Sequence, residues 1–172
     1  MKAKELAVGD STDLEIIYNT RTYRNRQSKK PSITYQQSTS DQSKHVEITA
    51  FVVSNPDSTY PIVIKPYKFN ISQFGEATRD ELTFEIHNVS PEDVEIKLVG
   101  MPVGMFSVEL PKKVSAGKSK EGKIKLNKDY IDEEFEKSIT IELSDKNLSR
   151  FTIPVKRQVR IPGKTSTAHS ND

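Results

Sequence analysis

The chain has 172 residues, of which 34% are hydrophobic and 29% charged, and its 26 basic and 24 acidic side chains leave a formal net charge of +2. This length suits one domain or two small ones, and the near-neutral charge predicts no strong attraction to polyanions. The chain has no cysteine, which excludes disulfide scaffolds, thiolate zinc sites, iron–sulfur clusters and cysteine nucleophiles. No apolar run approaches the roughly 20 residues of a membrane-spanning helix.

Apolar residues recur at every second position along most of the chain, which is the pattern of half-buried β-strands. In the first third, the alternating runs fall at residues 14–18, 33–35 and 46–52. Beyond it they fall at 62–64, 82–86, 94–98, 106–110, 124–126, 139–143 and 151–155. Residues 128–137 are the one stretch that leaves room for a helix, and it is short and acidic. Many short strands joined by polar turns predict an all-β protein with an immunoglobulin-like antiparallel β-sandwich.

An internal repeat relates the first third of the chain to the last. The segment around Gly9 resembles the segment around Gly117. With small deletions, the same alignment pairs Asn19 with Asn127 and matches further columns, namely Ile16/Ile124, Tyr18/Leu126, Tyr23/Tyr130, Ile33/Ile139 and Ile48/Ile153. A slowly drifting offset is what loop deletions between two copies of one fold produce.

The repeat predicts one partial copy followed by one complete copy. Residues 61–113 precede the match in the second copy and have no counterpart ahead of the first. We therefore expect residues 1–54 to form the C-terminal half of an Ig-like domain, either cut from a longer protein or completed by another chain through swapped or donated strands. We expect a linker at 55–60, a complete sandwich at 61–160 and a disordered tail at 161–172.

Residues 5–20, and their continuation to His45-Val-Glu-Ile-Thr-Ala, resemble the second half of a bacterial Ig-like domain family of unknown function. This Cys-Gly-Cys type family is similar to hydin, major-sperm-protein and pilus-chaperone sandwiches. Val8-Gly9-Asp10-Ser11 matches the family's Pro-Gly-Glu/Asp-Ser turn closely and residues 116–119 match it loosely. Asn88-Val89-Ser90 stands where the family has Asn-Thr-Gly, and both cysteines are absent.

The resemblance implies a non-enzymatic module of a larger bacterial protein that is periplasmic or extracellular, whereas the composition fits a cytoplasmic protein equally well. Its role would be structural or protein-binding, through sheet edges and end loops. The implied partner is another protein, or an upstream segment of the same protein, that completes the first sandwich. A strand-swapped dimer is a variant of the same idea.

A basic stretch supports the alternative of a polyanion- or carbohydrate-binding module. The candidate residues are Arg21, Tyr23, Arg24, Arg26, Lys29 and Lys30, which offer cations for phosphates or sulfates and a ring for stacking. Against it, both parts of the chain are close to neutral, and the equivalent loop of the second copy, residues 129–136, is acidic. A nucleic-acid-binding domain normally carries a clear basic excess, so nucleic acid is disfavoured.

The sequence contains no complete motif for a metal site or a catalytic site. The acidic stretch 129–136, with Asp129, Asp132 and Glu133, has oxygen ligands for calcium but not the spacing of an EF-hand. A hydrolase accessory domain with a carboxylate site is a third alternative. The histidines are scattered and no Gly-x-Ser-x-Gly elbow is present. We therefore assign no catalytic residue, cofactor or metal site, and predict that the chain is not an enzyme.

Four residues are expected to be structural. Gly9 and Gly117 occupy equivalent turns. Tyr23 and Tyr130 stand just ahead of a strand in each copy. A tyrosine at such a position covers the end of a sandwich with its ring while its hydroxyl bonds to backbone, as in a tyrosine corner.

Overall fold

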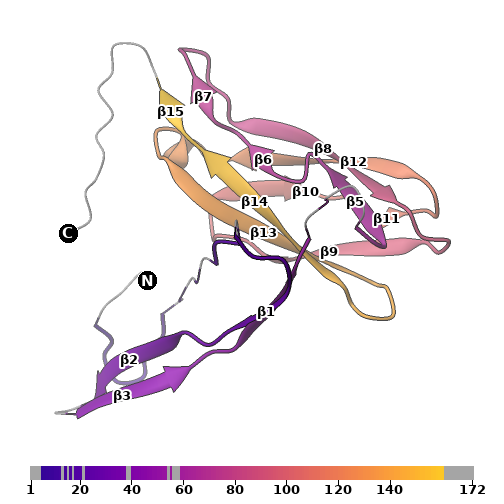
Figure 1. Ribbon diagram of the computed structural model, residues 1–172. Coiled ribbons are helices and arrows are strands. Elements are labelled where there is room, and N and C mark those ends of the chain that lie inside the picture. The colour runs from indigo at the N-terminus through magenta and orange to yellow at the C-terminus, as the bar shows by residue number, and fades with distance from the viewer. Residues whose placement is uncertain are drawn as a thin grey trace. The chain divides into compact units, whose positions relative to one another are not determined.

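The computed structural model divides the chain into two compact units, unit 1 (Met1–Ser54) and unit 2 (Asn55–Asp172), shown in Figure 1. The structure describes residues 5–12, 14, 16, 18–20, 22–37, 40–53, 55 and 59–160. The predicted tail at 161–172 and the candidate residue Arg21 lie outside this part of the chain.

Unit 2 is a sandwich of two sheets. One sheet has four antiparallel strands in the order β10 (Phe106–Glu109), β12 (Ser119–Leu126), β8 (Glu81–Asn88) and β5 (Ile62–Lys65). The other has five strands in the order β11 (Lys113–Val114), β9 (Val94–Gly100), β13 (Phe135–Leu143), β14 (Arg150–Arg157) and β6 (Phe69–Asn70). These two packed sheets confirm the predicted all-β, immunoglobulin-like class.

A parallel ladder closes one edge of the five-stranded sheet. Strand β6 runs parallel to β14, and β7 (Gln73–Phe74) runs parallel to β15 (Val159–Arg160). Backbone bonds join these pairs into one line, because the N–H groups of Ile71 and Gln73 donate to Lys156 and Gln158 at 3.0 and 2.8 Å. The chain between residues 69 and 75 therefore stays in register with the end of β14.

The core of unit 2 consists of the alternate apolar residues of both sheets. It includes Ile64, Phe84, Ile86, Ile96, Phe106, Ile124, Leu126, Ile139, Ile141, Ile153 and Val155. Aromatic pairs cross between the sheets, with ring centroids 4.5 Å apart for Phe69 and Phe84 and 5.7 Å apart for Phe106 and Phe135. The period-two pattern of the sequence thus places one face of each strand in a shared interior.

The acidic stretch at 128–137 does not form an α-helix. It begins with the 3-10 turn η2 (Lys128–Tyr130) and continues into β13. The side chain of Asn127 caps the turn by accepting a bond from the N–H of Asp129 at 3.4 Å. The alternation of Phe135, Ile139 and Ile141 begins inside this stretch, and it makes the later residues a strand.

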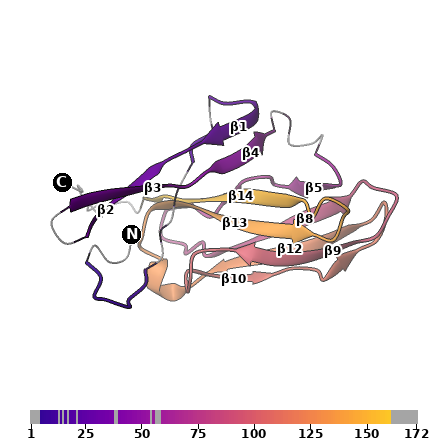
Figure 2. The ribbon, with the colours of Figure 1, turned by 90° about the horizontal axis from the view of Figure 1, so that it is seen from below.

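Unit 1 is built around a two-stranded antiparallel ribbon. Strand β1 (Asn25–Lys29) pairs with β4 (Ile48–Val52), and β2 (Ser32–Gln37) pairs with β3 (Ser40–His45). Both pairings share one register, from Asn25 opposite Val52 to Gln37 opposite Ser40. Figures 1 and 2 show the two pairs following one another along the ribbon. We call β1 and β2 the first arm of the ribbon, and β3 and β4 the second arm.

A proline separates the two strands of the first arm. Pro31 has no N–H to donate, so the ladder loses one inter-strand bond at that point. The N–H of Val46 still donates to the carbonyl of Pro31 at 3.1 Å. The register therefore continues across the break.

The ribbon has two different faces. Alternate residues of the two arms are half-buried on one face, namely Gln27, Lys29, Pro31, Ile33, Ile48, Ala50 and Val52. The other face is polar apart from Phe51, which is 69% exposed. None of the described residues of unit 1 is buried.

The expected strand at 14–18 is not observed among its described residues. Leu14, Ile16 and Tyr18 lie outside any strand, and Leu14 is 42% exposed. Its counterpart in unit 2, β12, is a strand between two partners, β8 and β10. The described part of unit 1 offers Leu14, Ile16 and Tyr18 no such partner, so apolar alternation alone does not make a strand there.

Candidate functional site

The ribbon of unit 1 is the candidate interaction site, because its outer edges pair with no further strand in the part of the chain that the structure describes. Among the strands that the structure describes, β1 pairs with β4 alone and β2 with β3 alone. The outer edge of each arm therefore presents backbone N–H and C=O groups that no described strand takes up. Apolar side chains are exposed along the ribbon as well, including Tyr35, Val46 and Phe51.

Two tyrosines and a lysine form a cluster beside the half-buried face. The rings of Tyr18 and Tyr23 lie 5.4 Å apart at 48°. Lys29 places its Nζ 4.3 Å from the centre of the Tyr23 ring and 5.9 Å from that of Tyr18, which is cation–π distance. Lys29 Nζ also donates to the hydroxyl of Tyr23 at 3.3 Å.

Lys29 was expected among the polyanion-binding residues, and its place in this cluster was not predicted. The alternation along the first arm was the available signal, since it puts Lys29 on the same face as Ile33. The hydroxyl of Tyr18 is buried and has no hydrogen-bond partner in the described part of the chain. The side chains of the cluster are thus packed against one another, but one of its polar groups, the Tyr18 hydroxyl, has no hydrogen bond within the described residues.

The structure distributes the other basic residues over different surroundings. Arg26 and Lys30 lie on the face opposite Lys29. Lys30 forms an exposed ion pair with Glu47 at 3.7 Å. The carbonyl of Arg24 accepts a bond from the Gln27 side chain at 2.7 Å. The described members of this set therefore do not converge on one anion-binding surface.

The two glycines expected to be structural occupy turns of the same geometry. Gly9 has φ +95° and Gly117 has φ +66°, the left-handed region that favours glycine. In unit 1 the N–H of Asp10 donates to Ala7 O at 3.0 Å, and in unit 2 the N–H of Lys118 donates to Ser115 O at 3.0 Å. Both are four-residue turns with glycine at the third position.

The two tyrosines of the repeat also follow equivalent turns. The N–H of Tyr23 donates to Thr20 O at 3.0 Å, and the N–H of Tyr130 donates to Asn127 O at 3.0 Å. Each tyrosine precedes a pair of antiparallel strands, the ribbon in unit 1 and β13–β14 in unit 2. The two turns and the strand pair thus agree between the units, whereas β12, which lies between the turns of unit 2, has no strand counterpart among the described residues of unit 1.

The tyrosine–lysine cluster has a counterpart in unit 2. The alignment places Tyr18 and Tyr23 at the positions of Leu126 and Tyr130, and counting back from the Ile33/Ile139 column places Lys29 at that of Phe135. Leu126 is buried in the core, and Tyr130 and Phe135 pack against it. At the third of these positions, Phe135 contacts the ring of Phe106 from the opposite sheet.

A serine, a histidine and a glutamate lie together on the outer face of the four-stranded sheet. Ser119 Oγ is 3.0 Å from His87 Nδ1 and donates to Glu85 Oε1 at 2.7 Å. In a catalytic triad the carboxylate orients the histidine. Here the carboxylate bonds to the serine instead, so the arrangement lacks the orienting contact that nucleophilic catalysis requires.

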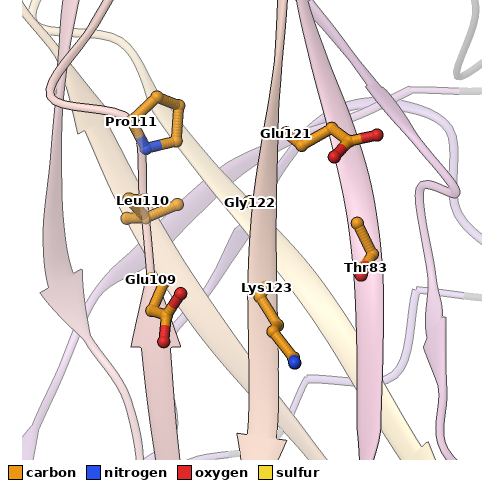
Figure 3. A pocket seen from close by; sticks show the side chains of 7 residues that line it. All are labelled: Thr83, Glu109, Leu110, Pro111, Glu121, Gly122 and Lys123. Carbon is orange, nitrogen blue, oxygen red and sulfur yellow. The ribbon is translucent and has the colours of Figure 1, made fainter.

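A groove opens where β10 leaves the four-stranded sheet. It has a volume of about 380 Å³ and is lined by Thr83, Glu109, Leu110, Pro111, Glu121, Gly122 and Lys123, shown in Figure 3. The pairing of β10 with β12 ends at Glu109 opposite Lys123, next to Leu110 and Pro111. Lys123 forms an ion pair with Glu81 at 2.9 Å, and this hydrogen bond raises the pKa of Lys123. The groove therefore presents charges of both signs, and its lysine is already paired.

The acidic turn of unit 2 contains no assembled metal site. The carboxylate of Glu134 accepts a bond from the N–H of Val159 at 3.0 Å. Asp129, Asp132 and Glu133 are exposed. Within the described ranges, no three His, Cys, Asp or Glu side chains lie close enough together to hold an ion.

Comparisons with known proteins give structural likenesses alone. No family model matches the chain, and no curated protein does. WR4, an MSP family member of Caenorhabditis elegans, has a TM-score of 0.44 at 15% identity, over 57% of this chain and 98% of its own. A Porphyromonas gingivalis W83 protein of unknown function has a TM-score of 0.43 at 12% identity, over 80% of this chain and 67% of its own.

A third similar structure is the CupB2 chaperone of Pseudomonas aeruginosa, with a TM-score of 0.40 at 13% identity over 56% of this chain and 55% of its own. These likenesses concern the fold and carry no inference about activity. In the described residues, no helix is long and apolar enough to cross a membrane.

Proposed function

We propose that the chain is a non-catalytic, Ig-like protein-interaction module, and that the ribbon of unit 1 is completed by a partner protein or by an upstream segment of the same polypeptide. The observation that carries the proposal is that the ribbon has an apolar face and two open edges, while no described residue of unit 1 is buried. A surface of this kind is a template for another strand.

The free energy of burying apolar side chains favours the addition of a further strand to the ribbon. An isolated two-stranded hairpin is at best marginally stable in water. Each Ile or Val side chain that becomes fully buried contributes about 1.5–3 kcal/mol. Ile33, Ile48 and Val52 are half-buried on the same face of the ribbon. A covering strand therefore stabilises unit 1 while it binds.

The repeat supports the interpretation of unit 1 as a partial copy of the Ig-like domain. The turns at Gly9 and Gly117 match, as do those at Tyr23 and Tyr130, and a strand pair follows in both units. In unit 2 the strands after Gly117 include β12, β13 and β14, which pair with β6, β8, β9 and β10, and β13 also pairs with β14. The ribbon of unit 1 corresponds to β13 and β14, and the described residues of unit 1 contain no strand that corresponds to the others.

We further propose that the chain belongs to the bacterial Ig-like family that residues 5–20 resemble, and that it works in the periplasm or outside the cell. The support is the Val8-Gly9-Asp10-Ser11 motif, whose glycine adopts the left-handed conformation such a turn requires. The family's two cysteines are absent from this chain, so the module works without them.

Hydrogen exchange of the full chain, with light scattering to establish its mass, tests the proposal. We expect amides of β1–β4 to exchange far faster than those of β13 and β14, because a two-stranded ribbon opens locally at low free energy. The β13–β14 pair is the matched control, since it is also antiparallel but is flanked by β9 and β6. Equal protection of the ribbon in a monomer would contradict the proposal. Equal protection in a dimer would identify a second copy as the occupant.

A further inference from the structure

The ribbon of unit 1 and its counterpart in unit 2 differ in register. The repeat aligns Ile33 with Ile139 and Ile48 with Ile153. In unit 2, Ile139 lies directly opposite Ile153. In unit 1, Ile33 instead lies opposite Lys44. The second arm is therefore displaced by four residues from the register that the repeat predicts, which we call the second register.

A displacement of four residues leaves every side chain on its own face of the ribbon. The side-chain period of a strand is two, so only an odd displacement exchanges the faces. In the second register, Ile33 would lie opposite Ile48 and Tyr35 opposite Val46. In the observed register, Tyr35 lies opposite Gln42. The second register thus pairs apolar side chains with one another on the half-buried face, which stabilises a two-stranded pairing.

The turn between the arms also fits the second register. The pairing of Gln37 with Ser40 leaves the two residues Ser-Thr to connect the arms, whereas two-residue hairpin loops favour Asn-Gly, Asp-Gly or an initial glycine. The second register would place Ser40-Asp41 in a longer turn. The β13–β14 turn of unit 2 contains the same dipeptide, and Asp145 accepts bonds there from the N–H and the hydroxyl of Ser149, both at 2.7 Å.

Polar contacts hold the observed register. Glu47 forms an ion pair with Lys30 at 3.7 Å and accepts a bond from the Ser28 hydroxyl at 2.8 Å. A shift of four residues would break both contacts and shorten the ladder by the same number of pairs. Exposed polar contacts contribute little to stability, whereas apolar pairs contribute most once a further strand buries them. The balance between the registers therefore depends on whether the ribbon is covered.

We infer that the ribbon of unit 1 has two registers, the observed one and the second register, and that a covering strand selects the second register. The selection follows because a covering strand binds a face of paired apolar residues more strongly than one in which Ile33 and Tyr35 lie opposite polar residues. This inference rests on the proposed function and adds to it the change by which the ribbon becomes equivalent to β13 and β14.

Disulfide trapping in the full chain measures both registers. The chain has no cysteine, and directly opposite residues of two antiparallel strands are close enough for a disulfide. Ser28 lies opposite Thr49 in the observed register, and Ser32 would lie opposite Thr49 in the second. Ser28→Cys with Thr49→Cys therefore reports the observed register, and Ser32→Cys with Thr49→Cys reports the second. All three residues are exposed, so the substitutions leave the half-buried face intact.

Ser28→Cys with His45→Cys is the matched control for local opening of the ribbon. His45 lies opposite Ser32, so the control pair is four residues out of register in the opposite direction. In the observed register its thiols are as far apart as those at Ser32 and Thr49, roughly 13 Å along the strand. A ribbon that only opens locally closes both pairs equally, whereas one that reaches the second register closes the Ser32 and Thr49 pair selectively.

The expected result in a glutathione redox buffer is an order of closure. The pair at Ser28 and Thr49 should have the highest effective thiol concentration. The pair at Ser32 and Thr49 should follow, at least about tenfold above the control pair. Equal values for the pair at Ser32 and Thr49 and for the control pair would overturn the inference.

Removal of the Glu47 contacts supplies a second readout. Glu47→Gln should raise closure of the pair at Ser32 and Thr49 about two- to fivefold, which is the effect of one exposed ion pair on an equilibrium. Asp41→Asn is the control, because it removes the same charge from the second arm outside the ion pair of Glu47 with Lys30. Equal effects of the two substitutions would contradict the inference that the Glu47 contacts hold the observed register.

A synthetic peptide supplies the covering strand. Strand β9 pairs with Thr140–Leu143 of β13, and the probe is a peptide with the sequence of residues 91–100, which include β9. An excess of this peptide should raise closure of the pair at Ser32 and Thr49 at least about threefold, and leave the control pair unchanged, because it binds the second register preferentially. A peptide of the same composition in scrambled order should have no effect. No rise with the β9 peptide would overturn the claim that a covering strand selects the second register.

Failure of the inference can be told apart from failure of the proposed function. If the ribbon amides of the monomer are protected before any peptide is added, the proposed function fails, whichever thiol pair closes. If they are open and the pair at Ser32 and Thr49 closes no more readily than the control pair, only the two registers inferred for the ribbon are wrong.

Discussion

At the scale of single residues, Arg157 organises one end of the sandwich. Its side chain is 1% exposed. It donates to the carbonyls of Ile71, Arg79 and Ile131, at 2.5–2.9 Å, and to the side chain of Gln73 at 3.2 Å. Burial lowers its pKa, while the charges of Asp132 and Asp80 oppose that change. A buried cation with neutral acceptors thus joins three loops to the end of β14.

We expect Arg157→Met to lower the free energy of unfolding by about 3 kcal/mol, because it leaves several buried carbonyls without donors. Arg157→Lys should recover little, since an ammonium lacks the planar fork that reaches several carbonyls at once. Urea unfolding followed by circular dichroism measures both variants. Wild-type stability of Arg157→Lys would show that the charge, and not the guanidinium geometry, is what unit 2 requires.

Gly122 is a second residue whose identity the packing requires. A Cβ built on it would lie 2.5 Å from the Phe84 ring and 3.0 Å from the carbonyl of Glu109. We expect Gly122→Ala to lower the free energy of unfolding by about 1–3 kcal/mol through overpacking. Gly104→Ala is the control, because that position has φ +73° but open space around it. Its loss should stay near 1 kcal/mol. A smaller loss at Gly122 than at Gly104 would contradict this account.

At the scale of elements, Asp93 joins two turns of unit 2. Its carboxylate forms an ion pair with Lys113 at 2.8 Å and accepts a bond from the N–H of Ala116 at 2.9 Å. The hydrogen bonds from Lys113 and Ala116 lower its pKa below the ordinary 3.8. The turn before β9 is thereby fixed to the glycine turn before β12.

This lowered pKa predicts a loss of stability in acid. A carboxyl whose pKa is lower in the folded state contributes stability above its unfolded value, and loses that contribution as the pH falls through its folded pKa. Asp93→Asn should therefore be less stable than the wild type near neutral pH, and the difference should shrink below about pH 4. Unfolding free energies measured across this range check it. A difference that stays constant with pH would show that the ionised form of Asp93 is not what matters.

Two examples show which structural features the alternation and charge of the sequence do not determine. The strands of unit 2 could be predicted because their alternating residues face one interior. The same alternation at Leu14 and Ile16 produced no strand, since a strand needs a neighbour as well as a pattern. Likewise, Lys29 could be read as a free cation from its charge, whereas Tyr18 and Tyr23 surround it in the structure.

At the scale of the whole molecule, the sequence predicted the fold class but not the pairing. The residues of β6 do not indicate that this strand runs parallel to β14, because the pairing depends on where the chain crosses between the sheets. The buried guanidinium of Arg157 was missed for a similar reason, since its acceptors are backbone carbonyls that carry no sequence signal. The turns at Gly9 and Gly117 were easier to predict, because glycine at a left-handed turn is a local requirement.

The charge of the ribbon's first arm has a consequence for copies of the same chain. Charged residues such as Arg26 and Lys30 on an exposed arm oppose its pairing with the same arm of a second copy, so they disfavour extension of the sheet from one copy to the next. Concentrated salt would weaken this protection by screening the repulsion.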